Sequence, residues 1–419
     1  MAINNRRYTT MSTPRILRPW IVLGAAFVVI ALGYAMRNTF TVFYPVLVAE
    51  FGWTRGVTAV MFSIGLLVYG LVAPLAGGLV DHFNPKLVLL SGGLLVGGGI
   101  ALCSVATQTW HFYLLYGVVV AVGLSFIGVT PLSTIVADWF PRRRALVFSI
   151  IIAGFGISLV TAPVFQTLIS RFGWQHAYVV IGVTAAAIIV PVVLLFIRRN
   201  RLPPESHAVP DAAMSSAATP AHDWTLRTAL PTRAFHVFLL ISFCNMGFAQ
   251  QFSIAHSVYV MQDTGYSPMA AASVFGTFGL AFAAGTLASA LSDRFGRTSV
   301  FVSGCLLASS GMLLLMLAGH LASILVALLF CISTGFGLGL GPPTAFAAAA
   351  DRFHGRNYGA IQGMLILSCS LGGALGPWVG GALHDLVGTY GLAMVIDIAI
   401  LLLSGVMMWG IQRERGALT

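Results

Sequence analysis

The chain has 419 residues, of which 58% are hydrophobic and only 8% are charged, with a formal net charge of +10. Soluble domains carry about 25% charged residues, so this composition excludes a water-soluble globular protein and predicts a chain that crosses the lipid bilayer several times. The basic residues flank apolar segments, so no nucleic-acid partner is expected.

A polar, basic tail (residues 1–19) leads into a full-length apolar segment, which is not the pattern of a cleavable signal peptide. Twelve apolar segments of about 20 or more residues follow, each long enough to cross a hydrocarbon core of about 30 Å. They lie near residues 20–48, 56–80, 87–106, 111–137, 145–169, 175–197, 235–261, 268–291, 298–318, 321–349, 357–383 and 390–411. The sequence therefore predicts an all-α membrane protein with twelve transmembrane helices.

One long polar segment, residues 198–234, interrupts this series and is rich in Pro, Ala and Ser. Such a composition is typical of a linker. It divides the chain into an N-terminal six-helix bundle (20–197) and a C-terminal six-helix bundle (235–411), with a short tail at 412–419.

The basic residues are unevenly distributed between the two sides of this arrangement. All except Arg37, Arg55 and Arg171 lie in the two tails, in the linker or in loops on the same side. Because positive charge accumulates on the cytoplasmic side, we expect both termini and the linker in the cytoplasm and the helices in the cytoplasmic (inner) membrane.

The two halves repeat each other. Three pairs of segments align in register, namely 77–95 with 289–307, 136–143 with 349–356, and 50–54 with 263–267. The first two pairs match Asp81 with Asp293 and Asp138 with Asp351. Duplicated halves in an apolar chain are typical of secondary transporters, whose substrate site lies between the halves near the middle of the membrane.

Three segments carry a family resemblance. The loop "SDRFGR" (292–297) resembles the G-x-x-x-D-R-x-G-R signature of the major facilitator superfamily. The segments "RNTFTVFYPVLVAEFGWTR" (37–55) and "DWFPRRRALVFSIIIAGFGIS" (138–158) resemble bacterial monocarboxylate transporters and oxalate:formate antiporters. The resemblance implies two pseudo-symmetric six-helix bundles and transport of small organic anions, often with a proton. The expected eighth and eleventh helices lack the charged residues of characterised relatives, so the substrate and the coupling ion stay open.

Acidic and basic residues in the short cytoplasmic loops are candidates for gating. Asp81, Asp138, Asp293 and Asp351 lie at expected helix ends, where a carboxylate can accept hydrogen bonds from a helix N-terminus or pair with Arg297. Such contacts would hold the cytoplasmic side shut in one state and break in the other. The alternative is that they only set topology and solubility.

Arg37 lies within the first apolar segment, where an unpaired charge costs about 3 kcal/mol or more. Tyr34 and Asn38 share its helical face. The repeat offset of 213 residues (250 − 37) places Gln250 and Gln251 at the matching depth of the second half. Because a guanidinium fork fits a carboxylate, we expect these five residues to line an anion-binding cavity.

Two further titratable residues lie in apolar segments. His256 and Asp397 are candidates for proton coupling, although a lone buried His is more often a hydrogen-bonded structural group. Asp397 is the one acidic residue within these segments, so a structural ion pair between Asp397 and Arg37 is the alternative to anion binding.

Catalytic and metal-binding motifs are missing from the sequence. It has no HExxH, nucleophile elbow or Walker loop, and its five cysteines lie in apolar runs without metal-ligand spacing. We therefore expect no enzyme, metal or cofactor, but a monomeric transporter that moves a small organic anion by alternating access, coupled to protons. The alternatives are an exporter of amphipathic xenobiotics and an anion exchanger without proton coupling.

Overall fold

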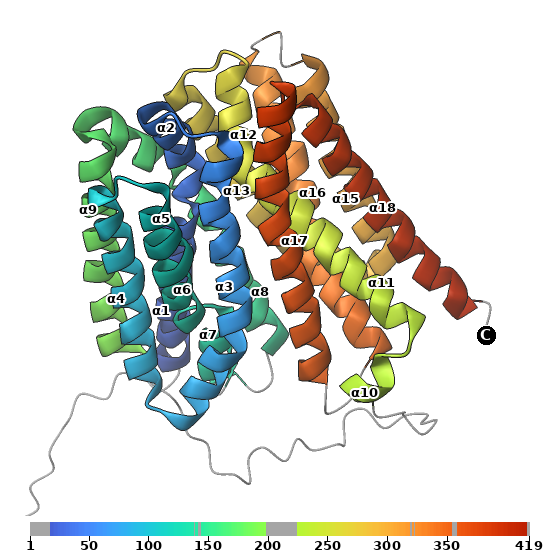
Figure 1. Ribbon diagram of the computed structural model, residues 1–419. Helices are drawn as coiled ribbons and strands as arrows, with labels where there is room; N and C mark the ends of the chain where they lie inside the picture. The colour runs from blue at the N-terminus through green and yellow to red at the C-terminus, as the bar shows by residue number, and fades with distance from the viewer. Residues whose placement is uncertain are drawn as a thin grey trace, which may run out of the picture.

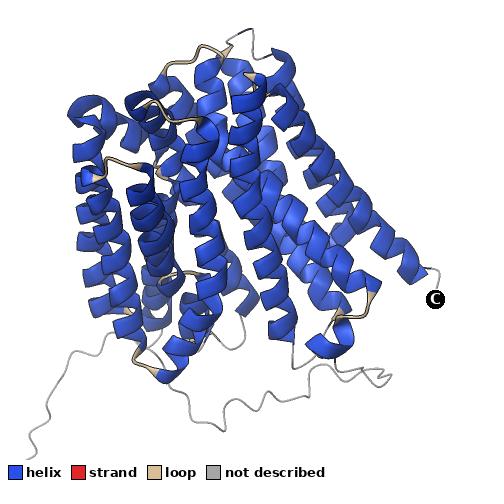
Figure 2. Ribbon diagram, in the orientation of Figure 1, coloured by secondary structure: helices blue, strands red, loops and turns tan. Residues whose placement is uncertain are grey.

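The computed structural model describes residues 17–137, 139–140, 144–197, 224–318, 321, 323–353 and 358–416. Every regular element within these residues is helical, and Figure 2 shows a bundle without strands in the described part. The predicted all-α class is confirmed.

The elements before the linker begin with a first transmembrane helix that is built in two pieces. They are α1 (Leu17–Asn38), α2 (Phe40–Phe51), α3 (Arg55–His82), α4 (Pro85–Leu102), η1 (Cys103–Val105), α5 (Thr109–Phe112), the π-helix η2 (Tyr113–Val120), α6 (Ala121–Phe126), α7 (Val129–Ala137), α8 (Arg144–Leu159) and α9 (Ala162–Phe196).

The elements after the linker include a second π-helix, which lies in the first span of that half. They are α10 (Leu226–Ala229), α11 (Arg233–Ile241), the π-helix η5 (Ser242–Ala249), α12 (Gln250–Asp263), α13 (Pro268–Ala288), η6 (Ser289–Leu291), α14 (Ser292–Phe295), α15 (Arg297–Ala318), α16 (Ile324–Arg352), α17 (Tyr358–Val387) and α18 (Gly391–Gly416).

Among the described residues, eleven helical stretches are long and apolar enough to cross a membrane. One of them, Ile150–Phe196, has 47 residues and contains Gly173 with a φ of +78°. This left-handed conformation, which glycine adopts without strain, breaks the helix and separates two crossings. Dividing that stretch at Gly173 turns eleven spans into twelve, which agrees with the sequence prediction.

The helices before the linker, in blue and green, gather on one side of the molecule, and those after it gather on the other (Figure 1). The start of α1, the end of α18 and α10 lie toward one end of the bundle, here called the tail end. The turns from α2 to α3, α12 to α13 and α17 to α18 lie at the opposite end, here called the far end.

The two halves contact each other most closely where glycines replace side chains. A Cβ added to Gly156 of α8 would lie 2.7 Å from the amide nitrogen of Ala283, and one added to Gly279 of α13 would lie 2.6 Å from the carbonyl oxygen of Gly156. A Cβ on Gly381 of α17 would lie 2.8 Å from the carbonyl oxygen of Arg55 in α3. Small residues thus let α8 cross α13, and α3 cross α17, in backbone contact.

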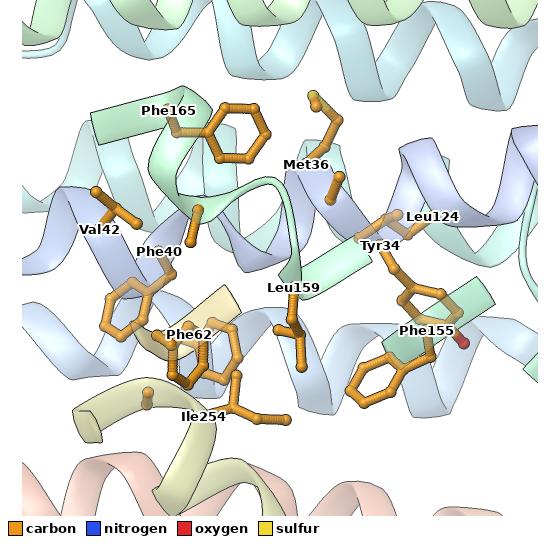
Figure 3. Close-up of a cluster of buried hydrophobic side chains, with 14 of the residues drawn as sticks. Tyr34, Met36, Phe40, Val42, Phe62, Leu124, Phe155, Leu159, Phe165 and Ile254 are labelled. Atoms are coloured by element: carbon orange, nitrogen blue, oxygen red, sulfur yellow. The ribbon is translucent and has the colours of Figure 1, made fainter. Parts of the chain in front are cut away.

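One large hydrophobic core includes side chains from both halves. Figure 3 draws part of it, in which Ile254 of α12 joins residues of the N-terminal half such as Phe62 and Leu159. The five cysteines are free thiols, and all except Cys369 are buried. Polar side chains enclosed by this core therefore stand out as candidate functional groups.

Candidate functional site

The first transmembrane helix passes from α1 to α2 at Thr39, whose φ of −53° and ψ of −31° keep the backbone helical, close to the predicted anion site. Two hydroxyl groups bond carbonyls at this junction. The hydroxyl of Thr39 donates to the carbonyl oxygen of Met36 at 2.8 Å, and the buried hydroxyl of Tyr116 in η2 donates to the carbonyl oxygen of Arg37. The second bond ties η2 to the part of α1 that carries Arg37.

The Arg37 side chain is buried, with 7% of its surface exposed. The central carbon of its guanidinium lies 4.9 Å from the ring centroid of Tyr34 and 5.1 Å from that of Phe155. Its Nε and Nη2 atoms are buried without a hydrogen-bond partner. These two nitrogens form one edge of the guanidinium plane, so Arg37 can donate two parallel hydrogen bonds to a carboxylate.

The proposed alternative partner of Arg37, Asp397, does not contact it. Asp397 is fully buried on α18, and both of its carboxylate oxygens lack hydrogen-bond partners. No ion pair joins Asp397, or any other carboxylate of the described residues, to Arg37. The role of Asp397 in proton coupling stays a prediction.

The other predicted site residues of α1 lie beside Arg37. The hydroxyls of Tyr34 and Tyr69 are 3.3 Å apart, and the Tyr34 ring meets the Phe155 ring edge to face, with centroids 5.1 Å apart (Figure 3). The side-chain amide of Asn38 donates to the hydroxyl of Ser158 at 2.8 Å. Asn38 therefore ties α1 to α8, and its side-chain oxygen Oδ1 is left without a partner.

Gln250 and Gln251 begin α12 and are buried, with 7% and 5% of their surfaces exposed. The Oε1 atom of Gln251 has no hydrogen-bond partner, and its Cγ atom lies 3.1 Å from the position of a Cβ on Gly373. Both residues are buried polar groups of the second half. Neither forms a hydrogen bond with Arg37, so their share in anion binding stays a prediction.

Arg55 joins the two halves at the far end. Its guanidinium forms an ion pair with Asp263 at the end of α12 and lies 3.7 Å from the ring centroid of Tyr259. The carboxylate of Asp385, at the end of α17, accepts hydrogen bonds from the backbone N–H groups of Arg55 at 2.9 Å and Gly56 at 2.6 Å. Asp385 thus caps the N-terminus of α3 from the opposite half. We call Arg55, Asp263 and Asp385 the far-end network.

His256 is fully buried beside this network and not beside Arg37. Its Nε2 lies 2.8 Å from the carbonyl oxygen of Pro377, and its Nδ1 lies 3.0 Å from the hydroxyl of Tyr390. Burial raises the pKa of Tyr390 above its usual range, so its hydroxyl keeps its proton. Because a carbonyl only accepts, the neutral ring carries its proton on Nε2 and accepts from Tyr390 at Nδ1.

The predicted gating residues of the second half form a cluster at the tail end. Arg297 pairs with Asp293, and its Nε lies 3.1 Å from the carboxylate of Asp351. All three belong to the C-terminal half, so the contacts described for Arg297 do not join the halves. The side chain of Asp81 and the whole of Asp138 lie outside the described residues, and gating by these five residues stays a prediction.

Four contributors to these clusters were missed from the sequence: Phe155, Tyr116, Asp263 and Asp385. Repeat alignment brought Asp263 to attention, since it matches Glu50, but not its pairing with Arg55. Among the described residues, no group of three or more His, Cys, Asp or Glu side chains is placed to hold a metal ion.

Known proteins resemble this chain along most of its length. Monocarboxylate transporter 13 of Rattus norvegicus is 27% identical over 403 residues, which cover 93% of this chain and 88% of that protein. Monocarboxylate transporter 3 of the same organism is 36% identical over 165 residues, 39% of this chain and 33% of that protein. An uncharacterized MFS-type transporter of Bacillus subtilis, YcxA, is 25% identical over 391 residues, 91% of each chain.

A solved structure shares the fold. It is a bacterial homolog of the human lysosomal transporter Spinster in an inward-facing and unoccupied conformation, with a TM-score of 0.72 and 16% identity over 96% of this chain and 98% of that one. The model of the Major Facilitator Superfamily matches residues 26–332 and 238–418. With twelve membrane crossings, duplicated halves and a buried cation in the first helix, the chain belongs to the Major Facilitator Superfamily of membrane transporters.

Proposed function

We propose that this transporter moves a small organic anion with one carboxylate group across the cytoplasmic membrane by alternating access. The observation that carries the proposal is the free edge of Arg37, whose Nε and Nη2 are buried without partners. A buried cation without a counter-ion is costly, and an incoming carboxylate supplies both the charge and the two acceptors that the edge lacks. The relatives named monocarboxylate transporters support this substrate class.

The far-end network supports the second part of the proposal, a gate. If the tail end faces the cytoplasm, as the distribution of basic residues indicates, the contacts of Arg55 with Asp263 and Asp385 close the external side. Opening requires these contacts to break, and gating of the internal side by the Arg297 cluster would need a further contact with the N-terminal half. Substrate would reach Arg37 from one side at a time.

His256 offers a route to proton coupling. A proton taken up from the external side would turn its Nδ1 from an acceptor into a donor, so the Tyr390 hydroxyl would have to reverse its hydrogen bond and accept. It would also add a positive charge near Arg55 and His384. External acid would therefore favour opening of the far end.

Uptake by purified protein in proteoliposomes tests the function. Radiolabelled acetate, lactate and benzoate are offered with and without an inward proton gradient, beside the neutral amide benzamide. Arg37→Ala should abolish anion uptake, and Arg37→Lys, which keeps the charge but loses the fork, should retain little of it. Arg171→Ala, an exposed arginine of the same half, is the matched control. Normal anion uptake by folded Arg37→Ala protein would refute the proposal.

A further inference from the structure

We propose that Phe155 is a positioning residue that holds the guanidinium of Arg37 ready for a carboxylate and links it to the opposite half through Phe282. The inference rests on the proposed function, because it takes Arg37 as the anion-binding group. It adds a residue that neither the sequence motifs nor the polar contacts single out.

The first support is the geometry of the rings around Arg37. The guanidinium carbon lies 4.9 Å from the Tyr34 ring and 5.1 Å from the Phe155 ring, within the range of cation–π attraction. The two rings meet edge to face at 89°. Aromatic contacts of this kind restrict the guanidinium plane, while the Nε and Nη2 edge keeps no protein partner. The side chain is therefore ordered before the anion arrives.

The second support is the way Phe155 itself is fixed. The hydroxyl of Ser158, one helical turn later, donates to the carbonyl oxygen of Phe155 at 2.6 Å. The same hydroxyl accepts the hydrogen bond from Asn38, the neighbour of Arg37 in the chain. Both the ring and the backbone of Phe155 are thus connected to the helix that carries Arg37. A displacement of Phe155 therefore displaces the surroundings of Arg37.

The third support is the contact with the other half. The Phe155 ring meets the ring of Phe282 in α13 at a centroid distance of 5.1 Å and an interplanar angle of 66°. The next residue, Gly156 of α8, is in backbone contact with Gly279 of α13 at the crossing of the two helices. Both rings are buried, with Phe282 1% exposed. Phe155 therefore connects the cation to the other half next to the closest point of the helix crossing.

These contacts give two separable effects. Without the Phe155 ring, only the Tyr34 ring lies beside Arg37, and the anion must supply the rest of its ordering. Immobilising a long side chain costs about 0.5–1.5 kcal/mol, or about two- to tenfold in affinity. Without the Phe282 ring, Arg37 keeps its own aromatic neighbours, and only the link between the halves is lost. Affinity should depend on Phe155, and exchange rate should depend on Phe282.

The test measures benzoate binding by calorimetry and benzoate counterflow in proteoliposomes. Phe155→Leu should lower benzoate affinity about two- to tenfold, and Phe155→Tyr, which keeps a flat ring, should restore it. Phe282→Leu should leave benzoate affinity within about twofold of wild type. It should slow counterflow about two- to tenfold, which corresponds to the interaction energy of one aromatic pair. Phe165→Leu, a buried phenylalanine of α9 outside these contacts, is the control.

Thermal unfolding of each variant without ligand checks that it is folded, and Phe155→Met provides a second ring-free variant if Phe155→Leu fails to fold. Wild-type affinity in the folded ring-free variants would overturn the inference, and so would an equal loss in Phe165→Leu. Benzoate binding that Arg37→Ala leaves unchanged would instead refute the proposed function, so the two failures are distinguishable.

Discussion

Replacing Asp385 should shift the transporter toward states in which the far end is open. Asp385 accepts two backbone hydrogen bonds across the interface, at 2.9 Å from Arg55 and 2.6 Å from Gly56. Removal of an N-terminal cap costs about 0.5–2 kcal/mol, and solvent exposure of Asp385 reduces the charge contribution. Asp385→Asn keeps one acceptor oxygen and should weaken closure by about 1 kcal/mol, and Asp385→Ala by about 2 kcal/mol. The closed-to-open ratio should fall about fivefold and about thirtyfold.

Spin-label distances across the far end measure this shift. Labels at Gln175 in the N-terminal half and Leu321 in the C-terminal half, both exposed, report the separation after alanine replaces the native cysteines. Glu50→Gln removes an exposed far-end carboxylate that belongs to no described ion pair and is the matched control. Unchanged distance distributions in both Asp385 variants, or an equal shift in Glu50→Gln, would refute the gate.

Three further outcomes are expected. Gly279→Ala should lower the free energy of unfolding by about 1–3 kcal/mol, because its Cβ would lie 2.6 Å from the carbonyl oxygen of Gly156. Gly98→Ala, with open space around it, should not lower it. Equal melting temperatures of the two variants would exclude a tight crossing. His256→Gln should flatten the rise of anion uptake at low external pH, and full pH dependence would remove His256 from coupling. Asp293→Asn, whose carboxylate is exposed, should leave unfolding within about 0.5 kcal/mol and benzoate affinity unchanged while altering counterflow; an unaltered rate would leave it a topology signal.

The extent to which the sequence predicted the site follows from how far apart the contacting residues are in the chain. Tyr34, Arg37 and Asn38 share one helical face because of their spacing, so their grouping required no tertiary information. Phe155 touches Arg37 through packing of α8 against α1, and apolar periodicity alone does not distinguish it from other buried aromatic residues. The positive-inside rule placed Arg55 in an outer loop without a partner. Its contact with Asp385, 330 residues later in the chain, is visible only in the fold.

The fold was more predictable than the site because lipid imposes helices of a minimum length on an apolar chain. The sequence located the region around Arg37 through its charge but not the contacts of Phe155 and Tyr116 with it. Segments such as Ala162–Phe196 differ from the expected spans because a single glycine turn, at Gly173, takes the place of a polar loop.

The cap that Asp385 places on α3 has a consequence for reversibility. If the halves part at the far end as proposed, the N–H groups of Arg55 and Gly56 and the Asp385 carboxylate would each bond water. An apolar seal of similar extent would expose surface that water does not solvate, so its rupture would be steeply uphill and its closure hard to reverse. In the proposed gate, the polar groups of the seal exchange protein partners for water instead. Both conformations then stay close in free energy, which allows repeated cycling.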